Sequence, residues 1–341
     1  MEQPGCLYYL SCWYTRNELA LRTACLYSGI LASRAFSSLI AAAITVNMDG
    51  AGGLRGWRWL FLIEGIATIV ISAIGFFSMP DFPRNTTWLS EDEAVLAAWR
   101  LHEEVGKEDW TSGKGQPFWE GFWLVLTDVK TWLLAPILFG IMSASSVTSF
   151  FPSAMGAFHH NQIATLLLLV PPYLFGIVVM LGNAWHADKT GERFYHITLP
   201  VCVAIVGFII AAATTSTSAR YASIMLMVPG LYSGYTIALV WISNTLTRPP
   251  AKRAAGLAFI DSIAHSSNTY FTYMYPKSAA PAFSGAFVHN CVLAAVAIAG
   301  AFALKVKLLR LNKQLEREEL VEGTEKLSPE GTVNQGFRFL V

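Results

Sequence analysis

The sequence predicts an all-α polytopic membrane protein, and three observations lead to this fold class. Hydrophobic residues make up 54% of the 341 residues and charged residues only 14%, whereas a soluble domain carries about 25% charge. The mean hydropathy is +0.44. The apolar residues gather in eight runs that are each long enough to cross a bilayer, and most of the charge lies between these runs.

Eight membrane-spanning helices are expected from these runs, because a hydrocarbon core of ~30 Å needs about 20 apolar residues in a helix. The expected spans are residues 24–46, 57–79, 132–155, 162–186, 195–214, 221–246, 254–275 and 283–304. Well inside them the full charges are Arg34, Glu64 and Asp261. An ion in hydrocarbon is costly, so each of these side chains needs a partner or a water-filled cavity.

A shorter apolar stretch precedes the first span. Residues 4–14 (PGCLYYLSCWY) would cover only about half of the hydrocarbon core at ~1.5 Å per residue. We interpret this stretch as the second half of a helix whose beginning is missing.

The long connection over residues 81–130 holds 15 of the 47 charged residues. Its sequence Ser90-Glu91-Asp92-Glu93 is typical of a capping box, so an amphipathic helix is predicted from there to about Val105. We expect this helix to lie on the membrane surface as a cytoplasmic linker. After the last span, a charged helical extension is predicted from Lys305.

Basic residues in the connections predict the orientation of the chain, because short loops rich in Lys and Arg stay in the cytoplasm. One side of the predicted bundle carries eleven such residues: Arg16, Arg22, Lys189, Arg193, Arg248, Lys252, Arg253, Lys305, Lys307, Arg310 and Lys313. The other side carries four: Arg55, Arg58, Arg220 and Lys277. The carboxyl-terminal tail is therefore expected to be cytoplasmic.

Composition and motifs argue against several other classes of protein. The 24 Lys and Arg nearly cancel the 23 Asp and Glu, so no basic excess is available to bind nucleic acid. The sequence contains no P-loop, no H-E-x-x-H motif and no G-x-S-x-G elbow. The five cysteines lie in apolar runs without C-x-x-C spacing, which favours small core residues over a metal site or disulfides. We therefore expect no enzyme activity, no metal and no cofactor.

Asp261, His265 and Asn268 are spaced i, i+4 and i+7, so they are expected on one face of a single helix. An ionisable pair inside a span is a candidate for proton coupling, and histidine titrates near neutral pH. Alternatively, Asp261 reaches toward water while His265 bonds a neighbouring helix. Arg34 also has two interpretations: it faces a cavity and attracts an anion, or it is a damaging substitution.

Aromatic residues in the apolar runs could line a pocket for a small, partly aromatic molecule. The candidates are Tyr9, Tyr173, Tyr235 and Trp241. For any one of them, packing between helices or a position at the membrane interface is the more common role.

Several motifs resemble one family of membrane proteins. The run DGAGGLRGWRWLFLIEG, followed by MPDFP and WLSEDE, resembles the major facilitator superfamily, and within it the fungal allantoate-permease-like anion:cation symporters. The segment PGCLYYLSCWYTRNELALR is similar to that family's fourth helix and the turn after it. Residues 187–193 (ADKTGER) resemble the D-[RK]-x-G-x-[RK] turn between helices eight and nine.

The resemblance implies a bundle of twelve helices, of which this chain supplies half of helix 4 and helices 5 to 12. It divides the chain into the remainder of the amino-terminal bundle (1–79), a cytoplasmic linker (80–131), a carboxyl-terminal bundle of six helices (132–306) and a cytoplasmic tail (307–341). It also implies secondary active transport of a small organic anion or vitamin-like carboxylate, with proton symport, by a monomer in the plasma membrane.

The resemblance further implies roles for individual residues. The substrate would bind between the two halves, against Tyr9, Thr148, Tyr173, Tyr235, Trp241 and Asn244. Proton coupling would fall to Asp261 and His265, and the cytoplasmic gate to Asp188, Lys189, Gly191 and Arg193. The alternatives are a non-transporting product of an incomplete gene model, a membrane-embedded enzyme, or a receptor that binds without transport.

Overall fold

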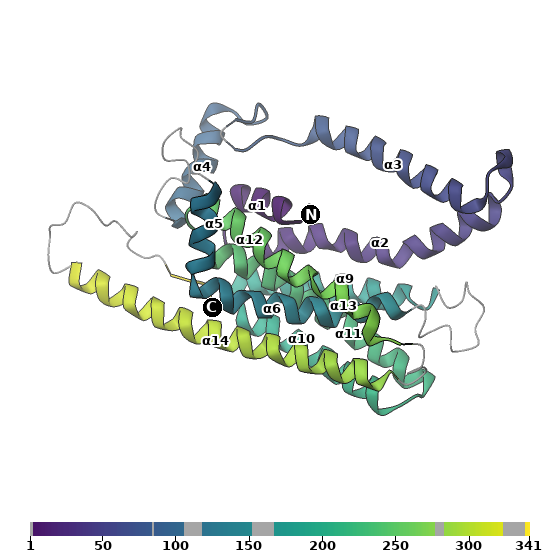
Figure 1. Cartoon of the computed structure of the whole chain (residues 1–341). Helices are drawn as coiled ribbons and strands as arrows, with labels where there is room; N and C mark the ends of the chain where they lie inside the picture. The colour runs from purple at the N-terminus through teal and green to yellow at the C-terminus, as the bar shows by residue number, and fades with distance from the viewer. Residues whose placement is uncertain (1–2, 84, 106–117, 152–166, 277–282, 323–337) are drawn as a thin grey trace.

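A computed structural model of the chain describes residues 3–83, 85–105, 118–151, 167–276, 283–322 and 338–341. Throughout these residues the regular elements are helices, which confirms the predicted all-α fold class (Figure 1). In chain order they are α1 (Gln3–Trp13), α2 (Leu19–Asn47), η1 (Ala51–Gly53), α3 (Gly56–Ser78), α4 (Glu91–Val105), α5 (Phe118–Thr127), α6 (Val129–Ser145), η2 (Ser146–Phe150), α9 (Val170–Thr190), α10 (Phe194–Ala213), α11 (Thr217–Thr245), α12 (Pro250–His265), α13 (Ser267–Met274) and α14 (Ser284–Glu322).

Over its described residues, each of the eight predicted spans is mainly helical, and the short stretch before them forms the 11-residue α1. Six helical stretches are long and apolar enough to cross a membrane: Leu19–Ile44, Gly56–Ser78, Val129–Ser149, Phe194–Ala213, Thr217–Thr245 and Ser284–Arg317. The spans expected at 162–186 and 254–275 are not among these six. Parts of the spans expected at 132–155 and 162–186 lie outside the described residues.

The span expected as one helix over residues 254–275 is divided between α12 and α13. The break falls at Ser266, whose hydroxyl donates a hydrogen bond to the Ile263 carbonyl at 2.6 Å. Serine hydroxyls that bond to the backbone in this way slightly weaken the helical ladder and often bend a helix. Asp261 and His265 therefore belong to α12, and Asn268 belongs to α13.

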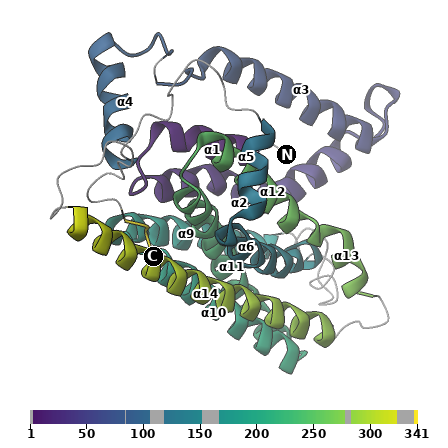
Figure 2. The same cartoon turned by 60° about the vertical axis from the view of Figure 1, so that its left-hand side comes forward.

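Helix α11 forms the centre of the bundle and packs against α10, α9, α6 and α2 (Figure 2). Most of its 29 residues are buried, including Trp241 and the glycines Gly230 and Gly234. A Cβ at Gly234 would lie 2.8 Å from a Val201 methyl carbon, so this glycine lets α10 and α11 approach closely.

Helix α4 begins and ends at the residues predicted for the amphipathic linker helix. The capping box forms as expected: the Ser90 amide donates to Glu93 Oε2 at 2.9 Å, and the Glu93 amide donates to Ser90 Oγ at 3.4 Å.

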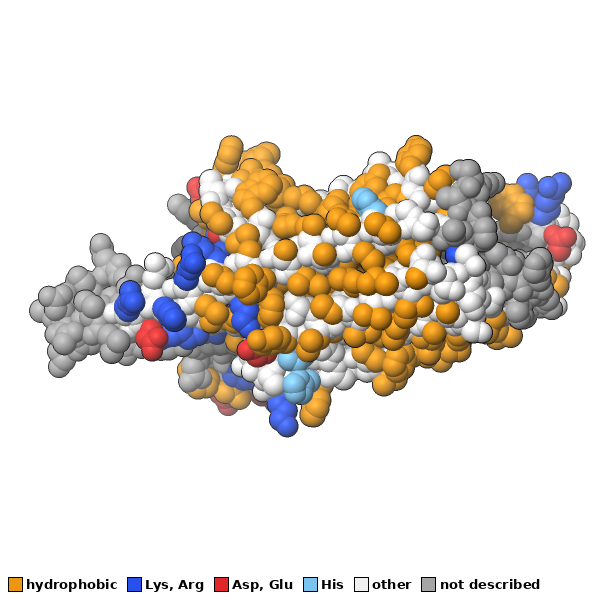
Figure 3. Space-filling view, turned by 90° about the horizontal axis from the view of Figure 1, so that it is seen from below, with side chains coloured by type: hydrophobic (Ala, Val, Ile, Leu, Met, Phe, Trp, Pro, Cys, Tyr) orange, Lys and Arg blue, Asp and Glu red, His pale blue; other side chains and the backbone are white. Residues whose placement is uncertain are grey.

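The surface formed by α10 and α14 carries apolar side chains along its length, with Lys and Arg gathered toward one end (Figure 3). Exposed apolar residues there include Leu199, Val203, Ile209, Val292 and Phe302. A surface of this kind suits hydrocarbon in the middle and lipid headgroups at the end.

Candidate functional site

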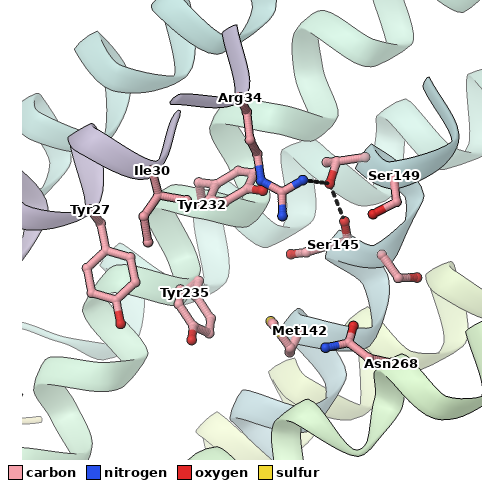
Figure 4. A pocket seen from close by; sticks show the side chains of 11 residues that line it. Tyr27, Ile30, Arg34, Met142, Ser145, Ser149, Tyr232, Tyr235 and Asn268 are labelled. Atoms are coloured by element: carbon pink, nitrogen blue, oxygen red, sulfur yellow. Dashed lines mark hydrogen bonds between the residues drawn. The ribbon is translucent and has the colours of Figure 1, made fainter. Parts of the chain in front are cut away.

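A cavity of about 80 Å³ lies where α2, the junction of α6 with η2, α11 and α13 meet (Figure 4). It is lined by Tyr27, Ile30, Arg34, Met142, Ser145, Ser146, Thr148, Ser149, Tyr232, Tyr235 and Asn268. Hydroxyl groups from α6 and η2 form one wall, and the tyrosines of α2 and α11 form another. The cavity is thus polar at one end and aromatic at the other.

Helical periodicity explains why α2 points three side chains into this cavity. Tyr27, Ile30 and Arg34 are spaced i, i+3 and i+7, which places them on one face of a helix. Tyr232 and Tyr235 share a face of α11 in the same way. The rings of Tyr27 and Tyr235 meet edge to face with centroids 5.6 Å apart, which fixes the aromatic wall.

Arg34 is the one fully charged residue among the described residues that line the cavity. Its Nη1 donates to Thr148 Oγ1 at 3.5 Å, and that hydroxyl donates in turn to the Ser145 carbonyl at 2.8 Å (Figure 4). Tyr173 of α9 is 3% exposed and lies close to both Arg34 and Thr148. A guanidinium surrounded by hydroxyl groups is suited to bind a carboxylate or another small anion.

Asp261 and His265 form a close pair at the end of α12. The Asp261 Oδ1 to His265 Nδ1 distance is 3.3 Å, and the His265 ring nitrogen also lies 3.0 Å from the Asp261 carbonyl oxygen. The carboxylate is near enough to interact electrostatically with Tyr27 and Tyr235. The pair therefore lies beside the aromatic wall, while Asn268 lines the cavity itself.

A second polar cluster, which we call the Asp188–Arg193 lock, joins the α1–α2 turn to the α9–α10 turn. Asp188 accepts hydrogen bonds from the Ala20 and Leu21 amides at 3.2 and 2.8 Å, and from Arg193 Nη2 at 3.0 Å. Arg193 Nη2 also donates to the Arg16 carbonyl at 2.6 Å. The Ala20 and Leu21 amides belong to the first turn of α2, where backbone donors have no partner within the helix and the helix dipole favours an anion.

The other residues of this turn have different roles. Gly191 ends α9 with φ of 69°, a left-handed conformation that favours glycine. Lys189 does not join the lock; its Nζ lies 5.4 Å from the centroid of the Trp185 ring. Two of the four predicted gate residues, Asp188 and Arg193, thus meet at the lock, and Gly191 lies in the turn between them.

The six residues expected to bind substrate fall into three places. Thr148 and Tyr235 line the cavity, and Tyr173 lies beside it. Tyr9 lies outside the cavity and donates a hydrogen bond from its hydroxyl to the Pro80 carbonyl at 2.8 Å.

The other two members of the set lie near the lock. Asn244 Nδ2 donates to the Arg16 carbonyl at 3.5 Å. Trp241 Nε1 donates to the Leu340 carbonyl at 3.0 Å.

Most of the hydroxyl groups of the cavity, including two of its tyrosines, were not predicted from the sequence: Tyr27, Ser145, Ser146, Ser149 and Tyr232. The spacing of Tyr27 from Arg34 was a usable signal, because residues at i and i+7 share one face of the expected helix. The run SASSVTS, which supplies the hydroxyl wall, was a second signal.

A third charged cluster lies where α5, α6 and α12 meet. Asp128 Oδ2 lies 2.6 Å from Lys252 Nζ and 3.5 Å from Lys130 Nζ. Burial raises the pKa of the Asp128 carboxyl, but the hydrogen bonds from Lys252 Nζ and the Lys130 amide outweigh burial, so its pKa ends below its ordinary value of 3.8. Within the described ranges, no group of three or more His, Cys, Asp or Glu residues could hold a metal ion.

Comparisons with known proteins agree on one family. Residues 1–272 match the model of the Major Facilitator Superfamily. The chain is 31% identical over 250 residues to "MFS transporter prlL" of Fungal sp. (strain NRRL 50135), covering 71% of this chain and 49% of that protein. It is 27% identical over 319 residues to "Major facilitator-type transporter hxnP" of Emericella nidulans, covering 92% and 63%.

A bacterial protein is similar over much of the same length. The chain is 30% identical over 261 residues to a protein named "Putative tartrate transporter" of Agrobacterium vitis, covering 76% of this chain and 58% of that protein. The chain thus spans about half to two thirds of the length of these relatives.

Proposed function

Because the chain belongs to the major facilitator superfamily, we propose that it serves secondary active transport of a small organic anion across a membrane, by alternating access to the cavity. The relatives are named transporters, which supports transport rather than catalysis. The chain spans about half to two thirds of their length, so the activity of the whole protein is part of this proposal.

Arg34 is the observation that carries the choice of an anion. Its guanidinium lines the cavity, bonds to Thr148, and brings a positive charge that hydroxyl and amide groups nearby do not neutralise. A carboxylate would offset this charge and accept hydrogen bonds from Arg34 and the hydroxyl wall. The Agrobacterium vitis relative is named for tartrate, a small organic anion, which also supports this class of substrate.

Uptake of radiolabelled tartrate into proteoliposomes tests this proposal. A hydrogen bond to a charged group is worth about 1.5–3 kcal/mol, so Arg34→Gln is expected to lower the initial uptake rate roughly 10- to 100-fold. Arg34→Lys should retain part of the rate. Arg58→Gln, an exposed cation on α3, serves as the matched control and should transport like the unmodified chain.

Two results would contradict the anion proposal. The first is uptake by Arg34→Gln at the unmodified rate. The second is equal uptake of an uncharged polyol of similar size. If a correctly inserted chain takes up neither tartrate nor a panel of small monocarboxylates, the chain is a non-transporting member of its family.

We further propose proton symport through Asp261 and His265. The 3.3 Å contact between them and the closeness of Asp261 to the aromatic wall support this role. Asp261→Asn is expected to abolish the acceleration of uptake by an inward proton gradient. Ser262→Ala, a neighbouring exposed position, should leave the acceleration intact. Gradient-dependent uptake by Asp261→Asn would show that the proton travels elsewhere.

The orientation and location complete the proposal. Eleven basic residues on the side of the lock, against four on the other, support a cytoplasmic lock and tail in a multi-pass protein of the plasma membrane. In this orientation the Asp188–Arg193 lock is the cytoplasmic gate.

A further inference from the structure

The segment Arg338–Val341 lies against the same end of the bundle as the lock; it is the short yellow trace beside the C label in Figures 1 and 2. The Arg193 amide donates to a main-chain oxygen of Val341 at 2.8 Å. Arg16 Nη1 donates to the Arg338 carbonyl at 3.0 Å. Arg16 and Arg193 are both members of the lock, so the segment bonds to each of the two turns that the lock joins.

Three further elements hold this segment. Trp241 of α11, which is fully buried, donates from Nε1 to the Leu340 carbonyl at 3.0 Å. Asn312 of α14 makes two hydrogen bonds with the Phe339 backbone, at 2.8 and 3.0 Å. Lys130 Nζ of α6 lies 4.9 Å from the centroid of the Phe339 ring.

The segment and the cavity contact α11 at different levels. Trp241 follows Tyr235 by six residues on this helix, a rise of about 9 Å at 1.5 Å per residue. Tyr235 lines the cavity, and Trp241 bonds the segment. The residue of α11 that bonds the segment therefore lies about 1.7 helical turns from a residue that lines the cavity.

We propose that Arg338–Val341 is a built-in plug that stabilises the closed state of this end, and that it must detach before the α1–α2 and α9–α10 turns can separate. This proposal deepens the proposed function, since the plug would slow the opening of the gate. The bonds to Arg16 and Arg193 can coexist only while the two turns are together, so the plug favours the closed state through contacts that the open state lacks.

Amide hydrogen exchange measured residue by residue in lipid nanodiscs tests the plug without any substrate. The Ala20 and Leu21 amides report closure, because Asp188 across the two turns accepts from both, whereas the hydrogen bonds of the plug described above go to other residues. Deleting residues 338–341 should speed their exchange several-fold. Asn312→Ala should give a smaller increase in the same direction, and Lys313→Ala, the exposed neighbour on α14, should give none.

The outcomes separate a plug from a local contact. Faster exchange of the Arg193 amide alone, with Ala20 and Leu21 unchanged, would overturn the proposal, because only the bond to Val341 would have been lost. If the deletion prevents folding, two substitutions replace it: Asn312→Ala, and Trp241→Phe, which removes the indole donor. Unchanged exchange of the Ala20 and Leu21 amides in both would overturn the proposal. A chain that takes up no anion but shows the expected exchange would contradict the proposed function and leave the plug standing.

Discussion

Replacing Asp188 by Asn is expected to destabilise the protein strongly, because it removes the negative charge at the centre of the lock. The Arg193 side chain is 0% exposed and the Asp188 side chain 10% exposed, so the guanidinium would stay buried after losing its carboxylate. Asn would still offer one oxygen to the α2 amides, but without the charge that favours the amino end of a helix.

The size of the effect follows from this burial. Breaking a buried ion pair by removing one partner costs about 3–5 kcal/mol. Asp188 keeps some contact with solvent, so we take the lower end, about 3 kcal/mol, which is roughly a hundredfold change in the ratio of folded to unfolded protein. Removing both charges leaves no buried ion uncompensated. The double variant Asp188→Asn/Arg193→Gln should therefore lose less than the two single variants add up to.

Reversible unfolding in detergent micelles, followed by circular dichroism, measures these free energies. Lys189→Ala is the matched control, because this neighbouring cation is exposed and its described side-chain contact is with the Trp185 ring. The substitution should change the free energy of unfolding by less than about 0.5 kcal/mol. The reasoning is refuted if Asp188→Asn also stays within about 0.5 kcal/mol, or if the double variant loses the full sum.

Two further predictions concern packing and pH. Gly140→Ala should destabilise the chain by about 1–3 kcal/mol in the same unfolding assay, because its Cβ would collide with the Leu293 carbonyl of α14, whereas Gly285→Ala meets nothing within 4 Å and should be neutral. Asp128 has its pKa held below 3.8, so its stabilising effect is complete above that pH and is lost as the pH falls through 3.8 toward the lower folded value. In Lys252→Gln, the free energy of unfolding should therefore fall less as the pH is lowered below about 4 than it does in the unmodified chain. An equal fall in both proteins would mean that the Asp128–Lys252 pair contributes nothing.

The sequence was sufficient to predict the helices but not all of their ends. Runs of about 20 apolar residues are required by the thickness of a bilayer, so their positions can be read directly. The break at Ser266 could not be predicted in this way. A serine hydroxyl can bond either to its own helix, as Ser266 does to the Ile263 carbonyl, or to a neighbouring group, and the sequence does not distinguish the two.

Residues of the candidate site could be predicted where their partners are close in the sequence, but not where their partners are far apart in it. Asp188 and Arg193 lie within six residues and bond each other at the lock, with Gly191 in the turn between them. Tyr9 instead bonds the Pro80 carbonyl 71 residues away, which places it outside the cavity. The Leu340 carbonyl accepts a hydrogen bond from Trp241, 99 residues earlier in the chain. The segment 338–341 is too short for a hydrophobic period to predict where it packs.

The contrast between α11 and α3 has a consequence for how this sequence can change over time. Of the most apolar stretch of each helix, 89% is buried within the described structure for α11 and 0% for α3. Nearly every side chain of α11 must therefore fit several neighbours at once, while α3 needs only to remain apolar. In a library of single substitutions, α11 should tolerate few exchanges even among apolar residues, and α3 should accept Leu, Ile, Val and Phe almost interchangeably.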